Sequence, residues 1–115
     1  ADVIEAIGHY DSLEAALAKV DVLLTPTLPV TAARVGQQTY RWKSREEPVF
    51  AACARFLAPF NLAGLPAISI PCGFSEDGMP IGLQLAGKPL AEATVLNAAN
   101  AFEKATKWHL MHPKL

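Results

Sequence analysis

Two apolar runs between positions 67 and 87 constrain the fold most. Ala67 to Ile70 reads as a buried strand, and after the turn dipeptide Asp77-Gly78 the residues Ile81, Leu83 and Leu85 alternate with small or polar ones. Apolar strands on either side of an Asp-Gly turn predict an antiparallel hairpin. The alternate positions of the second strand predict a face of small residues against which a helix packs: Gly82, Gln84 and Ala86.

The N-terminal part predicts a helix and a further strand. Asp11 and Glu14 have the spacing of a capping box, so we expect a helix from Ser12 to Lys19. Val22 to Leu24 is a short apolar run typical of a buried strand. The prolines within Thr25 to Pro29 withhold backbone donors, so the strand must end there and open into a loop.

The middle of the chain lacks apolar periodicity at first and then regains it. Residues 31–48 are rich in charge and are expected to form a surface loop or flap. A helical apolar spacing returns from Val49 to Leu57, and Pro59 is expected to end that helix. Asn61 and Gly64 tolerate positive φ, so we place both in a loop that reverses the chain before the next strand.

The C-terminal part completes an α/β pattern. An alanine-rich helix is predicted from Glu92 to Lys107, followed by a tail from Trp108 to Leu115. The apolar side of the helix is expected to hold Val95, Leu96, Ala99, Phe102 and Thr106. The alternation of helices and strands favours a three-layer α/β arrangement over a bundle or a barrel. Three strands make a poor complete sheet, so residues 1–115 are interpreted as a fragment of a larger domain.

Charge and composition exclude several classes of protein. Ten basic and eleven acidic residues are scattered along the chain, so no electrostatic footprint for nucleic acid or for an acidic membrane surface is present. Prolines interrupt the apolar stretches, which excludes a membrane-spanning helix. Nothing after Ala1 reads as a targeting signal. Cys53 and Cys72 form no CxxC motif, which favours free thiols in a reducing compartment and therefore a cytoplasmic location.

Four apparent motifs fail on inspection. Gly82 to Lys88 approaches the phosphate-loop pattern, but Pro89 stands where Ser or Thr should hold magnesium. His109 and His112 have no Cys, Asp or Glu near them in the tail, so a solvated tail is favoured over a metal site. Ser69 lacks the turn of a nucleophile elbow and is expected to be packed. Cys72 has no histidine or helix N-terminus near it in sequence that would activate its thiol as a nucleophile. No catalytic residue, metal or organic cofactor is therefore expected in this chain.

Four motifs occur in an order that carries a family resemblance. They are Asp21 to Thr27, Asn61 to Pro66, Ile81 to Leu85, and Trp108-His109. Together they resemble the C-terminal signature of the amidase signature enzymes. The resemblance implies the C-terminal part of a three-layer α/β/α amidase signature fold with a mixed sheet. It also implies an amidase whose serine, cis-serine and lysine triad lies N-terminal of this chain, so the expected partners are that missing part and a small-molecule amide substrate.

Three residues are candidates for substrate binding. Thr25 and Thr27 directly follow an apolar strand, and ligands of α/β sheets gather beyond the C-terminal ends of parallel strands. The resemblance also places this segment near substrate; the alternative is that both hydroxyls cap local backbone. For Asn61 the resemblance implies a place at the back of the active site, and the alternative is that it only makes the turn.

The subfamily is predicted from one position. The glutamyl-tRNA amidotransferase has an A subunit that resembles this chain through the same Asn61 motif, but it typically carries an aspartate seven residues earlier, to recognise the amino group of glutamine. Here Ala54 occupies that position and Arg55 beside it has the wrong charge. A general amidase is therefore favoured. The alternatives are the A subunit of a glutamine-dependent tRNA amidotransferase and a free-standing α/β binding module. Because the strands are apolar on both faces, we also expect a homo-oligomer.

Overall fold

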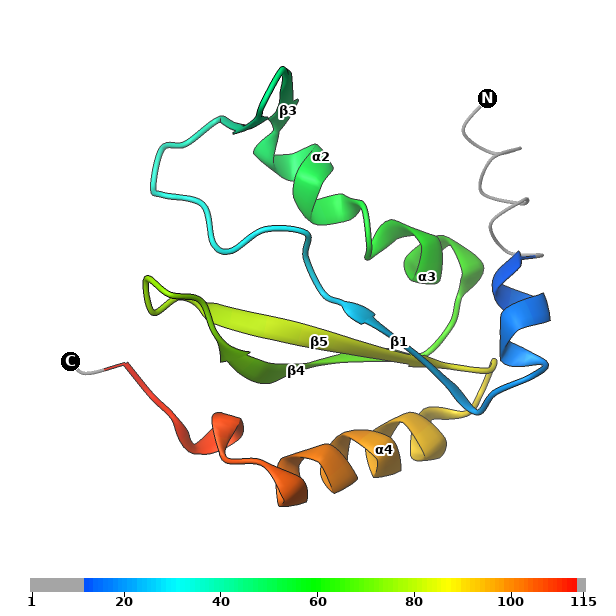
Figure 1. Cartoon of the computed structure of the whole chain (residues 1–115). Helices are drawn as coiled ribbons and strands as arrows, with labels where there is room; N and C mark the ends of the chain where they lie inside the picture. Colours follow the sequence, from blue (N-terminus) through cyan, green and yellow to red (C-terminus); the bar gives the residue numbers. More distant parts are fainter. Residues whose placement is uncertain (1–11, 114–115) are drawn as a thin grey trace.

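The computed structural model describes residues 12–113 (Figure 1). A helix at residues 12–17 comes first, as predicted, although Asp11 of the capping box lies outside the described residues. The elements that follow are β1 (Val22–Pro26), β2 (Thr39–Trp42), β3 (Arg45–Pro48), α2 (Val49–Ala54), α3 (Ala58–Ala63), β4 (Ala67–Phe74), β5 (Pro80–Gly87), α4 (Glu92–Ala105) and the short 3-10 helix η1 (Trp108–Leu110).

The main sheet has three strands in the order β1-β5-β4, so the last strand in sequence is central. Both pairings are antiparallel, and the predicted hairpin of β4 and β5 is confirmed. Gly78 adopts a φ of 81° in its turn and donates its N–H to the carbonyl of Ser75 at 2.9 Å. The register shifts between Pro71 and Gly73, which marks a bulge in β4.

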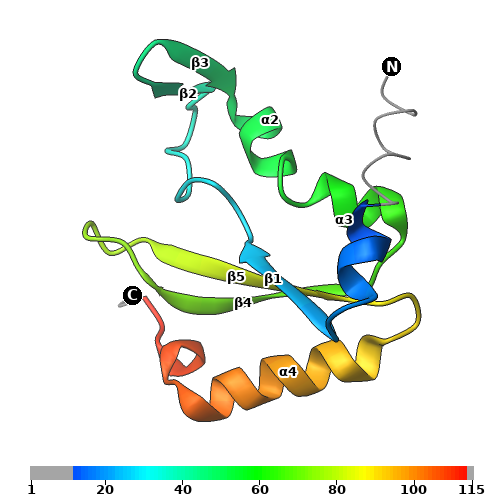
Figure 2. The same cartoon turned by 45° about the vertical axis from the view of Figure 1, so that its right-hand side comes forward.

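Helices lie on both sides of this sheet, which gives the three-layer α/β arrangement (Figures 1 and 2). On one side α4 packs against the sheet, and the core between them consists of Ile70, Leu85, Val95 and Ala99. The face of small residues on β5 is covered on the side of α2 and α3, where Gln84 bonds Phe56, and α4 lies on the other side. That helix packs against the face with Leu83 and Leu85 instead, because large side chains bury more apolar surface. Leu96, expected on the buried side of α4, is exposed.

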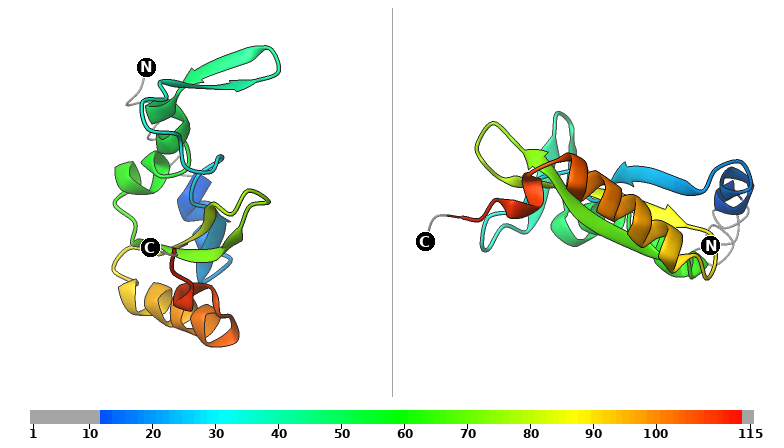
Figure 3. Two further views of the ribbon diagram at one scale, coloured as in Figure 1. Left: turned by 90° about the vertical axis from the view of Figure 1, so that its left-hand side faces the viewer. Right: turned by 90° about the horizontal axis from the view of Figure 1, so that it is seen from below.

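Residues 31–48, expected to form a surface loop or flap, contain a second sheet. β2 and β3 pair antiparallel, with Trp42 opposite Arg45. Figure 3 shows this hairpin at the end of the molecule opposite α4. Charged residues occupy several of its positions, so the hairpin lacks the apolar alternation that would have predicted strands.

The segment after α2 is helical, and the loop predicted there was wrong. Pro59 lies in the first turn of α3, where its fixed φ suits a helix and its missing N–H is not needed. Asn61 is therefore inside a helix. The expectation of positive φ holds for Gly64, which caps α3 with a φ of 64°.

The predicted solvated tail was also wrong at its start. η1 lies against β4, and the ring of Trp108 contacts the ring of Phe74 edge-on at 6.2 Å between centroids. His109 is half-buried, and its Nδ1 has no hydrogen-bond partner within residues 12–113. In this same part of the chain no helix combines the length and the hydropathy needed to cross a bilayer.

Candidate functional site

The sheet face opposite the α4 core carries a line of uncharged polar side chains. Gln84 of β5 is in register with Thr25 of β1 on one side and with Ser69 of β4 on the other. Side chains in register point to the same face, and Leu85, next to Gln84, points to the opposite one. With Thr27, two residues beyond Thr25, these four side chains form what we call the polar row.

Hydrogen bonds connect the polar row in two pairs. The hydroxyl oxygens of Thr27 and Ser69 lie 2.6 Å apart, and either can donate. Nε2 of Gln84 donates to Oγ1 of Thr25 at 3.1 Å and to the backbone carbonyl of Phe56 at 3.0 Å. Gln84 is only 4% exposed, so it joins the sheet to the segment between α2 and α3 from a buried position.

Gly82 makes room for the hydroxyl pair. A Cβ at this position would lie 2.7 Å from Oγ1 of Thr27 and 2.9 Å from Oγ of Ser69. Both separations are below van der Waals contact, so a larger residue would push the two hydroxyls apart. The absence of a side chain at Gly82 is therefore what allows Thr27 and Ser69 to meet.

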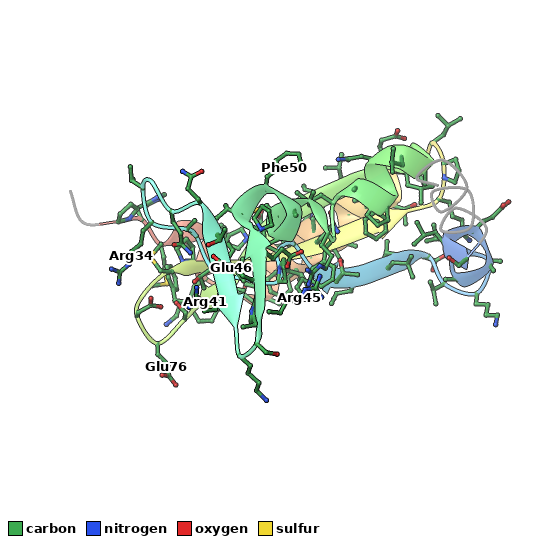
Figure 4. All side chains as sticks on the ribbon, turned by 90° about the horizontal axis from the view of Figure 1, so that it is seen from above. Arg34, Arg41, Arg45, Glu46, Phe50 and Glu76 are labelled. Atoms are coloured by element: carbon green, nitrogen blue, oxygen red, sulfur yellow. The ribbon has the colours of Figure 1, made fainter. Side chains whose placement is uncertain are left out.

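Charged groups lie on the β2–β3 hairpin instead. Figure 4 shows Arg41, Arg45 and Glu46 on that hairpin. The guanidinium of Arg55 donates to both carboxylate oxygens of the buried Glu47, and it stands 5.9 Å from the ring centroid of Trp42. Arg55 thus fixes the hairpin to α2, and its charge is compensated there. Within residues 12–113 no cluster of His, Cys, Asp and Glu has a geometry that could hold a metal ion.

Comparison with known proteins decides the family. The family model described as Amidase matches residues 5–96. The chain belongs to the amidase family. It is 48% identical over 103 residues to the A subunit of a glutamyl-tRNA(Gln) amidotransferase from Synechococcus elongatus, covering 89% of this chain and 20% of that protein. It is 45% identical over 98 residues to an amidase of Pseudomonas putida, covering 84% of this chain and 21% of that protein.

Solved structures of the amidase family share the fold. A crystal structure of an amidase has a TM-score of 0.80 at 31% identity, covering 90% of this chain and 24% of that one. The glutamyl-tRNA(Gln) amidotransferase A subunit from Thermotoga maritima has a TM-score of 0.70 at 38% identity, covering 90% and 22%. A 6-aminohexanoate cyclic dimer hydrolase complexed with substrate has a TM-score of 0.81 at 29% identity, covering 97% and 25%. The chain spans about a fifth of the length of these curated relatives.

The amidase chain brings two of its three predicted site residues together. The hydroxyls of Thr25 and Thr27 bond side chains of the polar row, and within residues 12–113 neither makes the backbone cap that was the alternative. The argument from parallel strands does not apply within residues 12–113, because β1 pairs only with the antiparallel β5 there. Asn61 is exposed on α3 and lines a separate hollow of about 400 Å³. That hollow is formed by Phe50, Cys53, Ala54, Leu57, Ala58, Asn61 and Leu62.

Two members of the polar row were missed by the sequence analysis. Ser69 was expected to be packed, but it is exposed and bonded to Thr27. Gln84 was expected only to help form a packing face, although a polar amide between two leucines of an apolar strand is a signal, because a buried amide needs partners. Cys53 and Cys72 are both free, as predicted, and both are half-buried.

Proposed function

We propose that this chain is the C-terminal portion of an amidase that hydrolyses carboxylic amide bonds. Its family membership supports this, as do the relatives named amidase and hydrolase. The observation that carries the choice of a general amidase is Ala54, at the end of α2. An aspartate at this position would bind the charged amino group of the substrate. The methyl group of Ala54 cannot bind an ammonium ion.

In the parent enzyme the triad of serine, cis-serine and lysine lies outside this chain. The lysine deprotonates the bridging serine, the nucleophilic serine attacks the amide carbon, and backbone amides stabilise the oxyanion. The C–N bond then breaks, and the amine leaves with the proton that the bridging serine took from the nucleophile. Water attacks the acyl-enzyme and releases the carboxylic acid and the free serine. This chain supplies one wall of the pocket, with Thr25 and Thr27 on the sheet and Asn61 on α3 as its substrate-binding residues.

A second candidate is the A subunit of a glutamine-dependent tRNA amidotransferase. The 48% identity to the cyanobacterial homologue of that name favours it. Arg55 cannot replace the missing aspartate, because its guanidinium carries the wrong charge and is bound to Glu47. A free-standing binding module is the third candidate. It is disfavoured because the outer edge of β1 has no partner strand within residues 12–113.

We also propose a cytoplasmic location for the parent enzyme, which the free thiols of Cys53 and Cys72 support. Its immediate partner is the N-terminal part of the same enzyme, and its ligand is a small amide.

Ammonia release tests the proposal. The full-length parent enzyme should release ammonia from neutral aliphatic or aryl amides and should show little glutaminase activity. Glutaminase activity that depends on a charged glutamyl-tRNA acceptor would show that the enzyme belongs to an amidotransferase instead.

A further inference from the structure

Gln84 carries a hydrogen-bond acceptor without a donor. The carbonyl of Phe56 can only accept, so the side-chain nitrogen of Gln84 must face it. Its second N–H goes to Thr25, and both amide hydrogens are then used. Oε1 accepts no hydrogen bond within residues 12–113, although the residue is 4% exposed. Oε1 of Gln84 is not one of the buried atoms without a partner in residues 12–113, so it is an acceptor that water or an N–H donor of a ligand can reach.

The hydroxyls of the polar row have hydrogens to donate. Thr25 accepts from Gln84, which leaves its own O–H free to point elsewhere. In the pair of Thr27 and Ser69 one hydroxyl donates to the other, and the accepting hydroxyl keeps a free hydrogen. The row thus offers two O–H donors on either side of one carbonyl acceptor. A carboxamide presents the complementary pair, a C=O that accepts and an N–H that donates.

The polar row is also uncharged. It contains only hydroxyls and an amide, and an ionised group placed against it would lose hydration without gaining a counter-charge. The row also holds no base that could activate one of its hydroxyls as a nucleophile. The scissile carbonyl of an amide must be polarised at the triad, which lies outside this chain. The polar row is therefore free to bind a second group of the substrate.

We propose that the polar row binds a neutral carboxamide-like group of the substrate, distant from the scissile bond, and so selects uncharged amides over ionised ones. This inference rests on the proposed amidase function. It adds Gln84 and Ser69 to the residues that determine specificity. The backbone of the missing N-terminal part offers the same chemistry as a carboxamide, so the experiment has to separate these two sources.

The test compares three amides of the same chain length as substrates of the full-length enzyme. Glutaramide carries a second carboxamide, glutaramate carries a carboxylate in its place, and valeramide has a methyl group there. The wild-type enzyme should prefer glutaramide to glutaramate by about tenfold or more in kcat/KM. Ser69→Ala should raise KM for glutaramide by about fivefold to tenfold and leave valeramide unchanged, because only glutaramide loses a hydrogen bond.

Two further variants keep the test decisive. Gln84→Met should erase the preference for glutaramide over valeramide, and Thr27→Val serves if the Gln84 variant does not fold. Thr94→Val is the matched control, since it removes an exposed hydroxyl of α4, outside the polar row, and should change neither KM nor Tm.

The outcomes separate the inference from the proposed function. A preference for glutaramate, or an unchanged KM for glutaramide in Ser69→Ala, would overturn the inference while the amidase function stands. A lower Tm with unchanged kinetics in the row variants would show that the row pairs with the enzyme's own backbone, and would overturn it as well. Failure to hydrolyse any amide would overturn the proposed function itself.

Discussion

The side-chain oxygens of Thr27 and Ser69 lie 2.6 Å apart, although 42 positions separate the two residues in the sequence. Thr27 follows the edge strand β1 and Ser69 lies on β4, with the central strand β5 between them. The two side chains meet across β5 because Gly82, on that strand, has no side chain to keep them apart.

Gly82→Ala should destabilise the protein by about 1–3 kcal/mol, because the new methyl group would overlap both hydroxyls. Thermal unfolding of the variant measures the loss. In a Thr27→Ala and Ser69→Ala background the loss should be much smaller, because two of the three close atoms are then gone.

Gly87→Ala provides a matched comparison. Its Cβ would lie 2.6 Å from Cγ2 of Val95 in α4, on the other side of the sheet. Adding Val95→Ala should therefore restore most of the stability that Gly87→Ala loses, but it should not restore the stability that Gly82→Ala loses. If Val95→Ala restored stability equally in both variants, Gly82 and Gly87 would not lie on opposite faces of the sheet.

Arg55→Met should cost about 1–2 kcal/mol, because it leaves the buried carboxylate of Glu47 without its main partner. The remaining neighbour, Arg45, is 3.9 Å away and mostly exposed. Urea unfolding of Arg55→Met, Glu47→Gln and the double variant would give the coupling energy, which should be close to about 1 kcal/mol.

The exposed pair of Arg41 and Glu46 is the control for that measurement. Its atoms approach to 3.3 Å, but both side chains are at least half exposed. Solvent screening should limit the coupling to under about 0.5 kcal/mol. A larger coupling here than at Glu47 would mean that burial does not set the strength of these ion pairs.

Alkaline pH should lower the free energy of unfolding, because the phenol of Tyr40 ionises. Partial burial raises the pKa of its phenol above 10.0, and the nearby Cys53 raises it further. The folded chain therefore favours the neutral phenol, whose O–H donates to the carbonyl of Thr31 at 2.7 Å. This contribution is complete below about pH 10 and is lost as the pH rises through the folded value.

Tyr40→Phe checks this pH dependence. Its Tm should be lower than that of the wild type at neutral pH, since one hydrogen bond of about 1 kcal/mol is lost. Between about pH 9 and pH 11 the Tm of the wild type should fall more steeply than that of the variant. Parallel curves would show that Tyr40 does not cause the alkaline loss.

The isolated 115-residue chain should self-associate at micromolar concentration. The outer edge of β1 has no partner within residues 12–113, and the exposed fraction is 65% for Leu24, 83% for Phe50 and 70% for Leu62. Figure 4 shows Phe50 pointing out from α2. Sedimentation equilibrium should detect dimers, and Leu24→Lys should reduce them by placing a charge on the open edge. A monomeric wild-type chain at high concentration would contradict this prediction.

Much of the fold could be predicted from the sequence because the deciding forces are local. The Asp77-Gly78 turn, the alternation in β5 and the apolar spacing of α4 each act over a few residues, and all three elements are present. Local reasoning also gives the family, through motifs that keep their order along the chain. It failed at Pro59, since a proline that ends one helix also suits the first turn of the next.

The candidate site depended on tertiary structure. Thr25 was recognised by its place after an apolar strand, but its partner Gln84 lies 59 positions away. A shift of the strand register by one residue would turn Gln84 into the α4 core, so no local pattern fixes this contact. Likewise Glu47 of the β2–β3 hairpin is bound by Arg55, which follows the neighbouring helix α2. The sequence by itself determined the elements and the family, and only the packing of the strands decided which side chains share a face.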